Sequence, residues 1–353
     1  MLPEGDAPKM FSERVLELDT EAEVDRLVRS IRALVRGALQ RRGAVVAISG
    51  GVDSALVAAL CVRALGSDRV LGLLLPERES SPESLVLGRK VAETFGIAFE
   101  IRELSAVLEA FGCYAERDDA IRSVLPEYGP GWRCKLVLPP LEGRGRINLS
   151  SVVAVGPTGE ERRARLPLGA YLRVVAASNL KQRMRAASAY HHAERLHYAV
   201  AGTPNRLEYD QGFFVKGGDG LADLKPIAHL YKTQVRALAE ALGVPAEICW
   251  RPPTTDTWSL AQSEEEFYFG LPCEKLDLCL WALNHGVPAS DVAPVVELAE
   301  AVVQRVFEDI VSKRRATRPL HLAPLLVEPV AELDDRIVSG SPTGWVPVPK
   351  DRA

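Results

Sequence analysis

The sequence of 353 residues predicts an α/β fold, a doubly wound parallel sheet with helices on both faces. Short apolar runs typical of buried parallel strands alternate with longer segments whose apolar residues recur at helical spacing. The composition agrees, because aromatic residues make up only 6% of the chain, whereas Ala, Leu and Val supply most of the apolar mass. In such sheets the crossovers are right-handed, and ligands bind beyond the carboxyl ends of the strands.

The first part of the chain shows the alternation clearly. Thr20 and Glu23 have the spacing of a capping box, which predicts the start of a helix over residues 20–38. The apolar run 44–48 follows and predicts a buried strand that leads into a glycine pair. The next expected elements are a helix over 54–65, a strand over 70–75, a helix over 82–95 and a strand over 99–104.

Residues 113–170 interrupt the alternation, and we interpret them as an insertion. The β-like segments 147–155 and 163–174 flank a Gly-Pro-Thr-Gly turn, so the insertion is expected to carry a hairpin. The α/β pattern then resumes with a helix over 179–197, a strand over 198–201 and a helix over 231–242.

The two ends of the chain differ from its centre. A helix is predicted over 295–313 from its apolar stripe, and the proline-rich tail from Pro319 is expected to be extended. We therefore divide the chain into an N-terminal arm (1–18), a main domain (19–285) that contains the insertion, and a C-terminal helix with its tail (286–353).

Charge and cysteine content narrow the class of protein. The net charge of −4 provides no basic field for a nucleic-acid backbone, and no apolar run approaches the ~20 residues of a membrane span. The N-terminus has no apolar core, so it is not a signal peptide. The six cysteines form no CxxC pair, which argues against a zinc site and indicates a reducing, cytoplasmic environment.

The glycine loop after the first predicted strand carries the strongest chemical signal. Glycine lets a backbone approach phosphate closely, and successive N–H groups at a helix start form an anion-binding nest. A carboxylate in such a loop would repel phosphate unless a cation such as Mg²⁺ lay between them. A plain glycine turn is the alternative, but the six-residue string in strand–loop–helix context favours a phosphate site. Its expected contacts are Ser49, Gly50, Gly51, Asp53 and Ser54.

This string lacks the G-x-x-x-x-G-K-[ST] pattern of kinases and GTPases and resembles the pyrophosphate loop of the ATP pyrophosphatase superfamily. The resemblance implies an adenine nucleotide alpha hydrolase-like fold and cleavage of ATP between its α- and β-phosphates. By itself it leaves amide formation, thiolation and other adenylations open.

Five further motifs occur in order and resemble those of ammonia-dependent NAD synthetases. Each has a recognisable counterpart in the family: N-x-K-x-R-x-R…Y, G-T-x-x-x-x-E, G-F-F-T-K-Y-G-D-G, P-x-x-x-L-x-K and P-T-A-D. In this chain they read Asn179–Arg185 with Tyr190, Gly202–Glu208, Gly212–Gly220, Pro226–Lys232 and Pro253–Asp256.

This resemblance implies an AMP-forming ligase that amidates nicotinic acid adenine dinucleotide with ammonia, using ATP and Mg²⁺. It implies that Asp53 and Glu208 hold the metal, that Lys216 and Lys232 neutralise triphosphate charge, and that Asp219 orients the nicotinate end or ammonia. Arg183, Tyr190, Thr203 and Thr254 are expected to contact nucleotide. Alternatively, Arg183 and Arg185 would belong to a solvated helix face, and Tyr190 would be a core aromatic with its hydroxyl paired.

The chain departs from the family pattern on the acceptor side. Gly217 replaces an aromatic residue and Val215 a threonine. Thr257 and Trp258 follow Asp256 where the family usually has leucine, and Ser263–Glu265 replaces its Ser-Asp-Glu. A relative that activates a different carboxylic acid is therefore the main alternative.

A tRNA-modifying thiolase is a second alternative, but this chain has neither the paired cysteines nor the basic RNA-binding surface that such enzymes need. A third is an inactive homologue, and the presence of Asp53, Glu208 and Lys232 argues against it. The resemblance also implies a homodimer acting on small molecules, without nucleic-acid or membrane partners.

Overall fold

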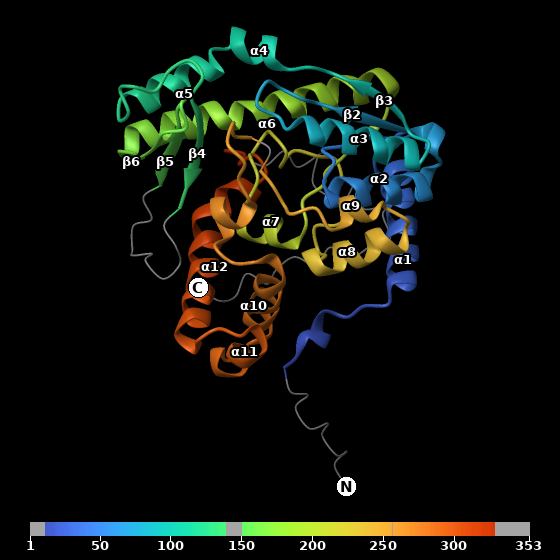
Figure 1. Ribbon diagram of the computed structural model, residues 1–353. Coiled ribbons are helices and arrows are strands. Elements are labelled where there is room, and N and C mark those ends of the chain that lie inside the picture. Colours follow the sequence, from blue (N-terminus) through green and yellow to red (C-terminus); the bar gives the residue numbers. More distant parts are fainter. Residues whose placement is uncertain (1–10, 139–149, 256, 329–353) are drawn as a thin grey trace.

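A four-stranded parallel sheet in the order β3-β2-β1-β7 lies at the centre of the fold (Figure 1). The computed structural model describes residues 11–138, 150–255 and 257–328. The strands are β1 (Ala44–Ala47), β2 (Val70–Leu74), β3 (Ala98–Ile101) and β7 (Ala199–Ala201). The sheet and the helices on its two faces confirm the predicted α/β class.

Alternate residues of each strand enter two separate cores, which explains their continuous apolar character. Val46 packs with α1 (Thr20–Arg32), α2 (Val52–Leu65) and α8 (Lys232–Ala241) on one face. Val45 packs with residues of the long helix α6 (Leu168–Leu196) on the other face. The remaining short elements near the sheet are the π-helical turn Ala33–Ala38, the 3-10 turn Ser67–Arg69, α3 (Pro82–Thr94), α4 (Ser105–Ala110) and α9 (Ala246–Cys249).

The insertion is larger than a hairpin. Helix α5 (Cys113–Arg122) precedes an antiparallel sheet of β4 (Arg133–Val137), β5 (Ser151–Val155) and β6 (Glu161–Arg165). The predicted hairpin β5–β6 is confirmed, and β4 pairs with its inner strand. Helix α5 packs along α6, and the cluster that joins them to the small sheet includes Ile121, Val152 and Val174.

Two boundaries and one cap of the predicted elements in the first two thirds of the chain are wrong. The second β-like segment ends at Arg165, and α6 starts at Leu168 rather than at residue 179. Buried Val174 and Ala177 and partly buried Tyr171 and Val175 lie at helical spacing, so packing overrides the strand propensity of the β-branched and aromatic residues. The side chain that caps α1 is Asp19, which accepts from the Ala22 N–H at 3.0 Å, and not Thr20.

The C-terminal part is a helical layer with its own core. It contains α10 (Cys273–His285), α11 (Ala289–Val296) and α12 (Glu300–His321), and α7 (Arg206–Gln211) packs beside it. The predicted helix 295–313 is thus split at Glu297, whose φ of 53° ends α11, and α12 continues through Pro319. The first part of the N-terminal arm that the structure describes packs here too, through Leu16 of the 3-10 helix Glu13–Leu16.

No helix in residues 11–138, 150–255 and 257–328 is long and apolar enough to cross a bilayer.

Candidate functional site

A cavity of about 540 Å³ opens where strands β1, β2 and β7 end. Its walls come from the glycine loop, the segment after β2, one face of α6, the segments that follow β7, and the chain from Arg251 to the π-helical turn Glu265–Phe269. This position is where parallel α/β sheets bind ligands. The volume is within the range of small-molecule sites.

The glycine loop takes a shape that only glycine supports at one position. Gly50 has a φ of +80°, and a Cβ atom there would lie 2.6 Å from the Ser84 carbonyl oxygen of α3. Gly51 caps the N-terminus of α2 and faces the cavity, where a Cβ would meet nothing closer than the Ser49 Oγ at 3.5 Å. The loop thus presents backbone N–H groups and the start of an α-helix to the cavity, as a phosphate site requires.

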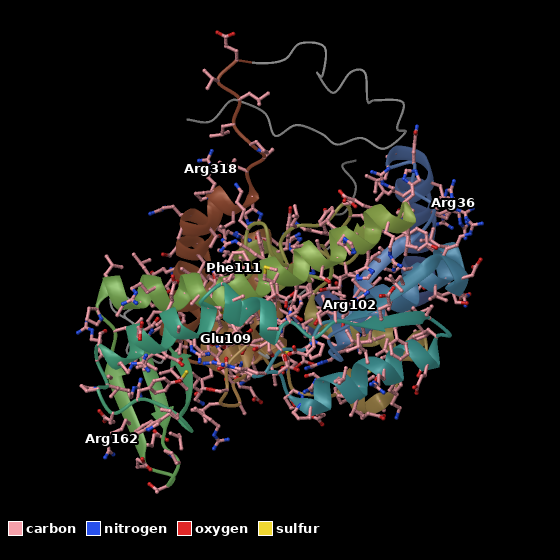
Figure 2. All side chains as sticks on the ribbon, turned by 90° about the horizontal axis from the view of Figure 1, so that it is seen from above. Arg36, Arg102, Glu109, Phe111, Arg162 and Arg318 are labelled. Atoms are coloured by element: carbon pink, nitrogen blue, oxygen red, sulfur yellow. The ribbon has the colours of Figure 1, made fainter. Side chains whose placement is uncertain are left out.

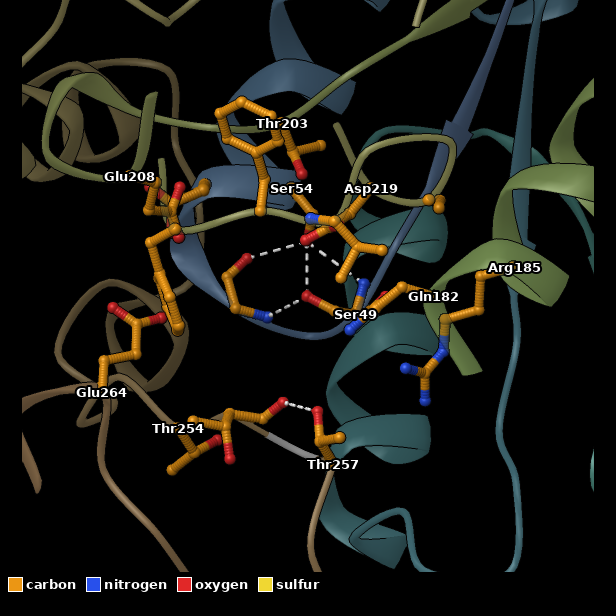
Figure 3. Close-up of a pocket in the computed structure, with 18 of the residues that line it drawn as sticks. Ser49, Ser54, Gln182, Arg185, Thr203, Glu208, Asp219, Thr254, Thr257 and Glu264 are labelled. Atoms are coloured by element: carbon orange, nitrogen blue, oxygen red, sulfur yellow. Dashed lines mark hydrogen bonds between the residues drawn. The ribbon is translucent and has the colours of Figure 1, made fainter. Parts of the chain in front are cut away.

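Two hydroxyl groups fix the loop from inside. The Oγ atoms of Ser49 and Ser54 lie 3.1 Å apart, and the Ser49 N–H donates to the Ser54 Oγ at 3.2 Å. The Ser54 hydroxyl is also 3.0 Å from the Gly51 carbonyl oxygen. Figure 3 shows both serines at the centre of the pocket. The loop is therefore preorganised without a ligand.

Asp53 is the acidic residue of the loop, and two side chains hold it. Lys232 at the start of α8 donates through Nζ to Oδ2 at 2.5 Å, and the Asn205 amide donates to Oδ1 at 3.0 Å. The Lys232 side chain is 3% exposed and that of Asp53 16%. Sequence separations of 179 and 152 residues show that the fold alone creates this arrangement.

Glu208 and Glu264 extend this acidic group. Glu208 belongs to the capping box that starts α7, where it accepts from the Asn205 N–H at 2.8 Å. Burial, together with the charges of Asp53 and Glu264, raises the pKa of the Glu208 carboxyl well above its usual range. Burial also raises the pKa of Glu264, and Asp53 adds to this effect while Lys232 opposes it.

Lys232 is the cation that these carboxylates share. Although burial opposes its charge, Asp53, Glu264 and Glu208 raise the pKa of Lys232, so it stays protonated. One ammonium does not neutralise three carboxylates, and this charge deficit adds to burial, which is the main cause of the raised pKa values of Glu208 and Glu264. An added cation would relieve the deficit.

Positive and neutral polar groups also line the cavity, and Figure 3 shows Gln182 and Arg185 across the pocket from Glu208 and Glu264. Arg185 and Gln182 project from α6, and Arg185 reaches only distant partners, the Leu75 carbonyl oxygen at 3.4 Å and the Ser80 hydroxyl at 3.5 Å. Arg251 binds the Ser84 hydroxyl at 3.2 Å. Both guanidinium groups line the cavity and suit phosphate or carboxylate groups of a ligand.

Most of the predicted site residues lie together. Those that line the cavity are Ser49, Gly51, Asp53, Ser54, Thr203, Glu208, Asp219, Lys232 and Thr254. Gly50 shapes the loop from behind. Asp256 of the quoted Pro253–Asp256 motif lies outside the described residues.

Three predicted site residues lie outside the cavity of this chain. Arg183 is exposed on α6. Tyr190 packs in a core cluster and donates its hydroxyl to Asp223 at 3.2 Å, as its alternative interpretation required. Lys216 donates to the carbonyl oxygens of Pro319 and Leu322 at the end of α12, at 3.0 Å each. Their proposed ligand contacts remain predictions.

Sequence reasoning assigned no role to several residues that the structure brings to the site. Arg185 and Glu264 stood inside quoted segments, and helical periodicity would have placed Arg185 on the same face as Gln182 rather than Arg183. Arg251 precedes the Pro-Pro pair of the next motif. Asn205 carried a local signal, because it has capping-box spacing to Glu208.

Known proteins show similarity along most of the chain. The family model described as NAD synthase matches residues 23–124 and 161–318. A protein of Rhizobium rhizogenes named NH(3)-dependent NAD(+) synthetase is 56% identical over 321 residues, which covers 91% of this chain and 96% of that relative.

Two solved structures share the fold. The NMN synthetase of Francisella tularensis has a TM-score of 0.60 and 20% identity, covering 88% of this chain and 99% of its own. The NH3-dependent NAD synthetase of Campylobacter jejuni has a TM-score of 0.56 and 20% identity, covering 88% of this chain and 100% of its own.

Proposed function

The chain belongs to the NAD synthase family, and we propose that it uses ATP and ammonia to amidate nicotinic acid adenine dinucleotide, giving NAD, AMP and pyrophosphate. The observation that carries this proposal is the joining of the pyrophosphate-type loop with Asp53, Lys232 and Glu208 in one cavity. A phosphate-binding loop next to a lysine and several carboxylates fits an enzyme that cleaves ATP rather than a protein that only binds a nucleotide.

The chemistry divides into two displacements. A carboxylate oxygen of the acceptor attacks the α-phosphorus of ATP, the bond to the β-phosphate oxygen breaks, and pyrophosphate leaves with the electron pair. Ammonia then adds to the acyl carbon of the resulting acyl-adenylate. The bond to the adenylate oxygen breaks, AMP leaves, and the nitrogen loses a proton to give the amide.

The residues of the cavity suit the first displacement. The Ser49–Ser54 loop would hold the departing pyrophosphate through backbone N–H groups and the helix start. Lys232 would offset the charge that grows on it, since preorganised cations act mainly on developing charge. Arg185 and Arg251 would orient anionic groups of the two substrates.

We propose Asp53 and Glu208 as the protein ligands of Mg²⁺, with Glu264 nearby. Their charge excess fits a divalent cation. Within residues 11–138, 150–255 and 257–328, no three His, Cys, Asp or Glu side chains are grouped so that they could hold a metal ion by themselves. The rest of the shell of such an ion would come from waters and phosphate oxygens, which Mg²⁺ commonly keeps. When bound, the ion would neutralise triphosphate charge.

Asp219 and the aromatic residues beside it are proposed to receive the acceptor. The Asp219 carboxylate accepts from the Val215 N–H at 2.7 Å and lines the cavity with Phe213 and Phe214. Thr203 and Thr254 lie on the cavity wall with hydroxyls for ribose or phosphate groups. These assignments follow the family motifs on which the residues stand.

We also propose a cytoplasmic homodimer. The exposed pair Leu168 and Leu172, one turn apart on α6, offers apolar surface for a second copy. Arg183, on the same helix outside the cavity, would then act at or near that interface. All six cysteines are free thiols, as in a reducing compartment.

Turnover with defined substrates tests the function. With ATP, Mg²⁺, ammonia and nicotinic acid adenine dinucleotide, we expect NAD, AMP and pyrophosphate in equal amounts. A second carboxylate is worth testing because Leu136 and Ser150 line the cavity from the part of the insertion that the family model does not match. We choose nicotinic acid mononucleotide as the comparison substrate, because it carries the same carboxylate on a smaller molecule. Faster AMP release with it, and no NAD from the dinucleotide, would contradict the proposal.

A further inference from the structure

A hairpin-shaped loop, residues 253–255 and 257–264 (the 253–264 loop), forms the wall of the cavity that carries Glu264. Its two arms are joined to each other. The Glu264 N–H donates to the Pro253 carbonyl oxygen at 3.3 Å, and the Thr255 N–H donates to the Gln262 carbonyl oxygen at 3.2 Å. Thr254 also forms an antiparallel bridge with Ser263. These bonds shape the stem, while the position of the loop depends on what holds its far end.

Strand β4 of the insertion holds that end. The Leu260 N–H donates to the Cys134 carbonyl oxygen at 3.2 Å, and the Cys134 N–H donates to the Ser259 Oγ at 2.8 Å. The Gln262 side chain, which is 4% exposed, donates to the Leu136 carbonyl oxygen. The loop therefore lies along β4 much as an additional edge strand would.

The core of the insertion also encloses a side chain of the loop. Trp258 is 5% exposed and packs in one cluster with Ile121 of α5, Cys134 of β4 and Val152 of β5. A buried tryptophan contributes a large apolar area, so separating the loop from the insertion would expose it. The contact between loop and insertion is thus part of a core.

A buried ion network provides a second attachment. Lys181 of α6 is 1% exposed, and its Nζ donates to the Thr257 carbonyl oxygen at 2.8 Å. The same Nζ pairs with Glu77 at 2.9 Å and Glu79 at 2.5 Å. Arg117 of α5 binds Glu79 at 2.5 Å. Removing one member of a buried ion network leaves an uncompensated charge. The network therefore holds α5, α6 and the 253–264 loop in fixed positions.

We propose that the insertion positions Glu264: by holding the 253–264 loop, sheet β4–β5–β6 keeps this carboxylate in the wall of the cavity that Asp53 and Lys232 also line. Ser259, Gln262 and Lys181 are then positioning residues, because they act on the site through the loop. Strands β4 and β5 lie in residues 125–160, which the family model does not match, so this support is additional to the shared family motifs. The consequence for turnover rests on the proposed function.

The physical half of the proposal is tested without substrates. The double variant Ser259→Ala/Gln262→Ala removes two of the bonds to β4. Amide hydrogen exchange should speed up in residues 257–266, while the β1 and α2 peptides stay unchanged. Arg162→Ala is the matched control, since Arg162 lies at the outer end of the same sheet, pairs with Glu127, and forms no hydrogen bond or ion pair with the described residues of the loop (Figure 2). Unchanged exchange in the double variant would overturn the proposal.

The functional half uses a double-mutant cycle. We expect the double variant to weaken binding of Mg²⁺ with α,β-methylene-ATP, measured by calorimetry, by about 10-fold. In a Glu264→Gln background the same change should weaken it less than about 2-fold, because the positioned carboxylate is already gone. Ser259→Thr, which keeps the hydroxyl acceptor, should bind nearly as well as the wild type. Equal losses in both backgrounds, or an equal loss in Arg162→Ala, would contradict positioning through Glu264.

This binding measurement needs no acceptor. A wild-type protein that binds the analogue and makes no NAD would overturn the proposed function, while the cycle would still decide whether the insertion positions Glu264.

Discussion

The Nζ atom of Lys232 lies 2.5 Å from the Oδ2 atom of Asp53, across 179 residues of sequence. The pair joins the N-terminus of α2 to the N-terminus of α8, the two helices that start at the cavity. Glu208 and Glu264 act electrostatically on the same pair. A single ion pair is thus the centre of the acidic group that Glu208 and Glu264 complete.

Asp53→Asn should lower the rate of pyrophosphate release by about 10²–10³-fold, because the loop loses the charge that balances the metal and Lys232. The protein should stay folded, since Glu208 and Glu264 still face the Lys232 ammonium. Quenched-flow measurement of pyrophosphate, with circular dichroism for folding, checks both points. Release at the wild-type rate would exclude Asp53 as a metal ligand.

The pH dependence of the metal requirement should follow Glu208. Because its carboxyl pKa is raised in the folded protein, it holds a proton at low pH and gains its charge only as the pH rises. The Mg²⁺ concentration for half-maximal activity should therefore decrease as the pH rises above the range in which an ordinary glutamate loses its proton. Glu208→Gln should need more Mg²⁺ at every pH and lose this dependence. An unchanged pH profile in that variant would assign the titration to another group.

The same raised pKa predicts an effect on stability. A carboxyl whose folded pKa is raised stabilises the fold fully below its unfolded pKa of about 4.3, and this contribution is lost as the pH rises through the folded pKa. At pH 8, Glu208→Gln should therefore unfold at a higher temperature than the wild type without ligands, since Gln can keep the capping box. Calorimetry at pH 5 and pH 8 checks it, with the difference confined to the higher pH.

Alanine substitutions at the two loop glycines should have different effects on stability and on ATP binding. Gly50→Ala forces a side chain into a positive φ and against the Ser84 carbonyl, so the free energy of unfolding should fall by about 1–3 kcal/mol. The Cβ of Gly51→Ala makes only an ordinary contact, 3.5 Å from the Ser49 Oγ, and should leave stability within about 0.5 kcal/mol, while its methyl group obstructs phosphate and raises the KM for ATP. Denaturant titration and steady-state kinetics on both variants separate folding from binding. Equal instability would mean that the cavity face of the loop is as crowded as its rear.

Arg185 and Arg183 lie two residues apart on α6 and should differ in effect. Arg185 lines the cavity with only distant partners, so Arg185→Ala should cost about 10- to 100-fold in kcat/KM, as loss of a charged hydrogen bond does. Arg183→Ala should cost less than about 3-fold in a monomeric site. A large loss at Arg183 together with dimers in light scattering would instead place Arg183 at a shared site, as the family resemblance implies.

The succession of strands and helices along the chain, the phosphate loop and the family motifs were predictable because each depends on neighbours within a few residues. Apolar runs predict buried strands wherever they occur, and glycine at Gly50 is required by local backbone geometry. Local signals failed at residues 166–174, where helix packing outweighed strand propensity, and at Glu297, where a single residue splits the late helix.

By itself the sequence determined the fold class, the loop and the choice of Asp53, Glu208 and Lys232. Only the tertiary structure decided that Asn205 holds Asp53, that Arg185 rather than Arg183 faces the cavity, and that the insertion supports the loop with Glu264. The reason is physical: these contacts join atoms more than a hundred residues apart, and their strength depends on burial and neighbouring charge, which a linear pattern does not contain.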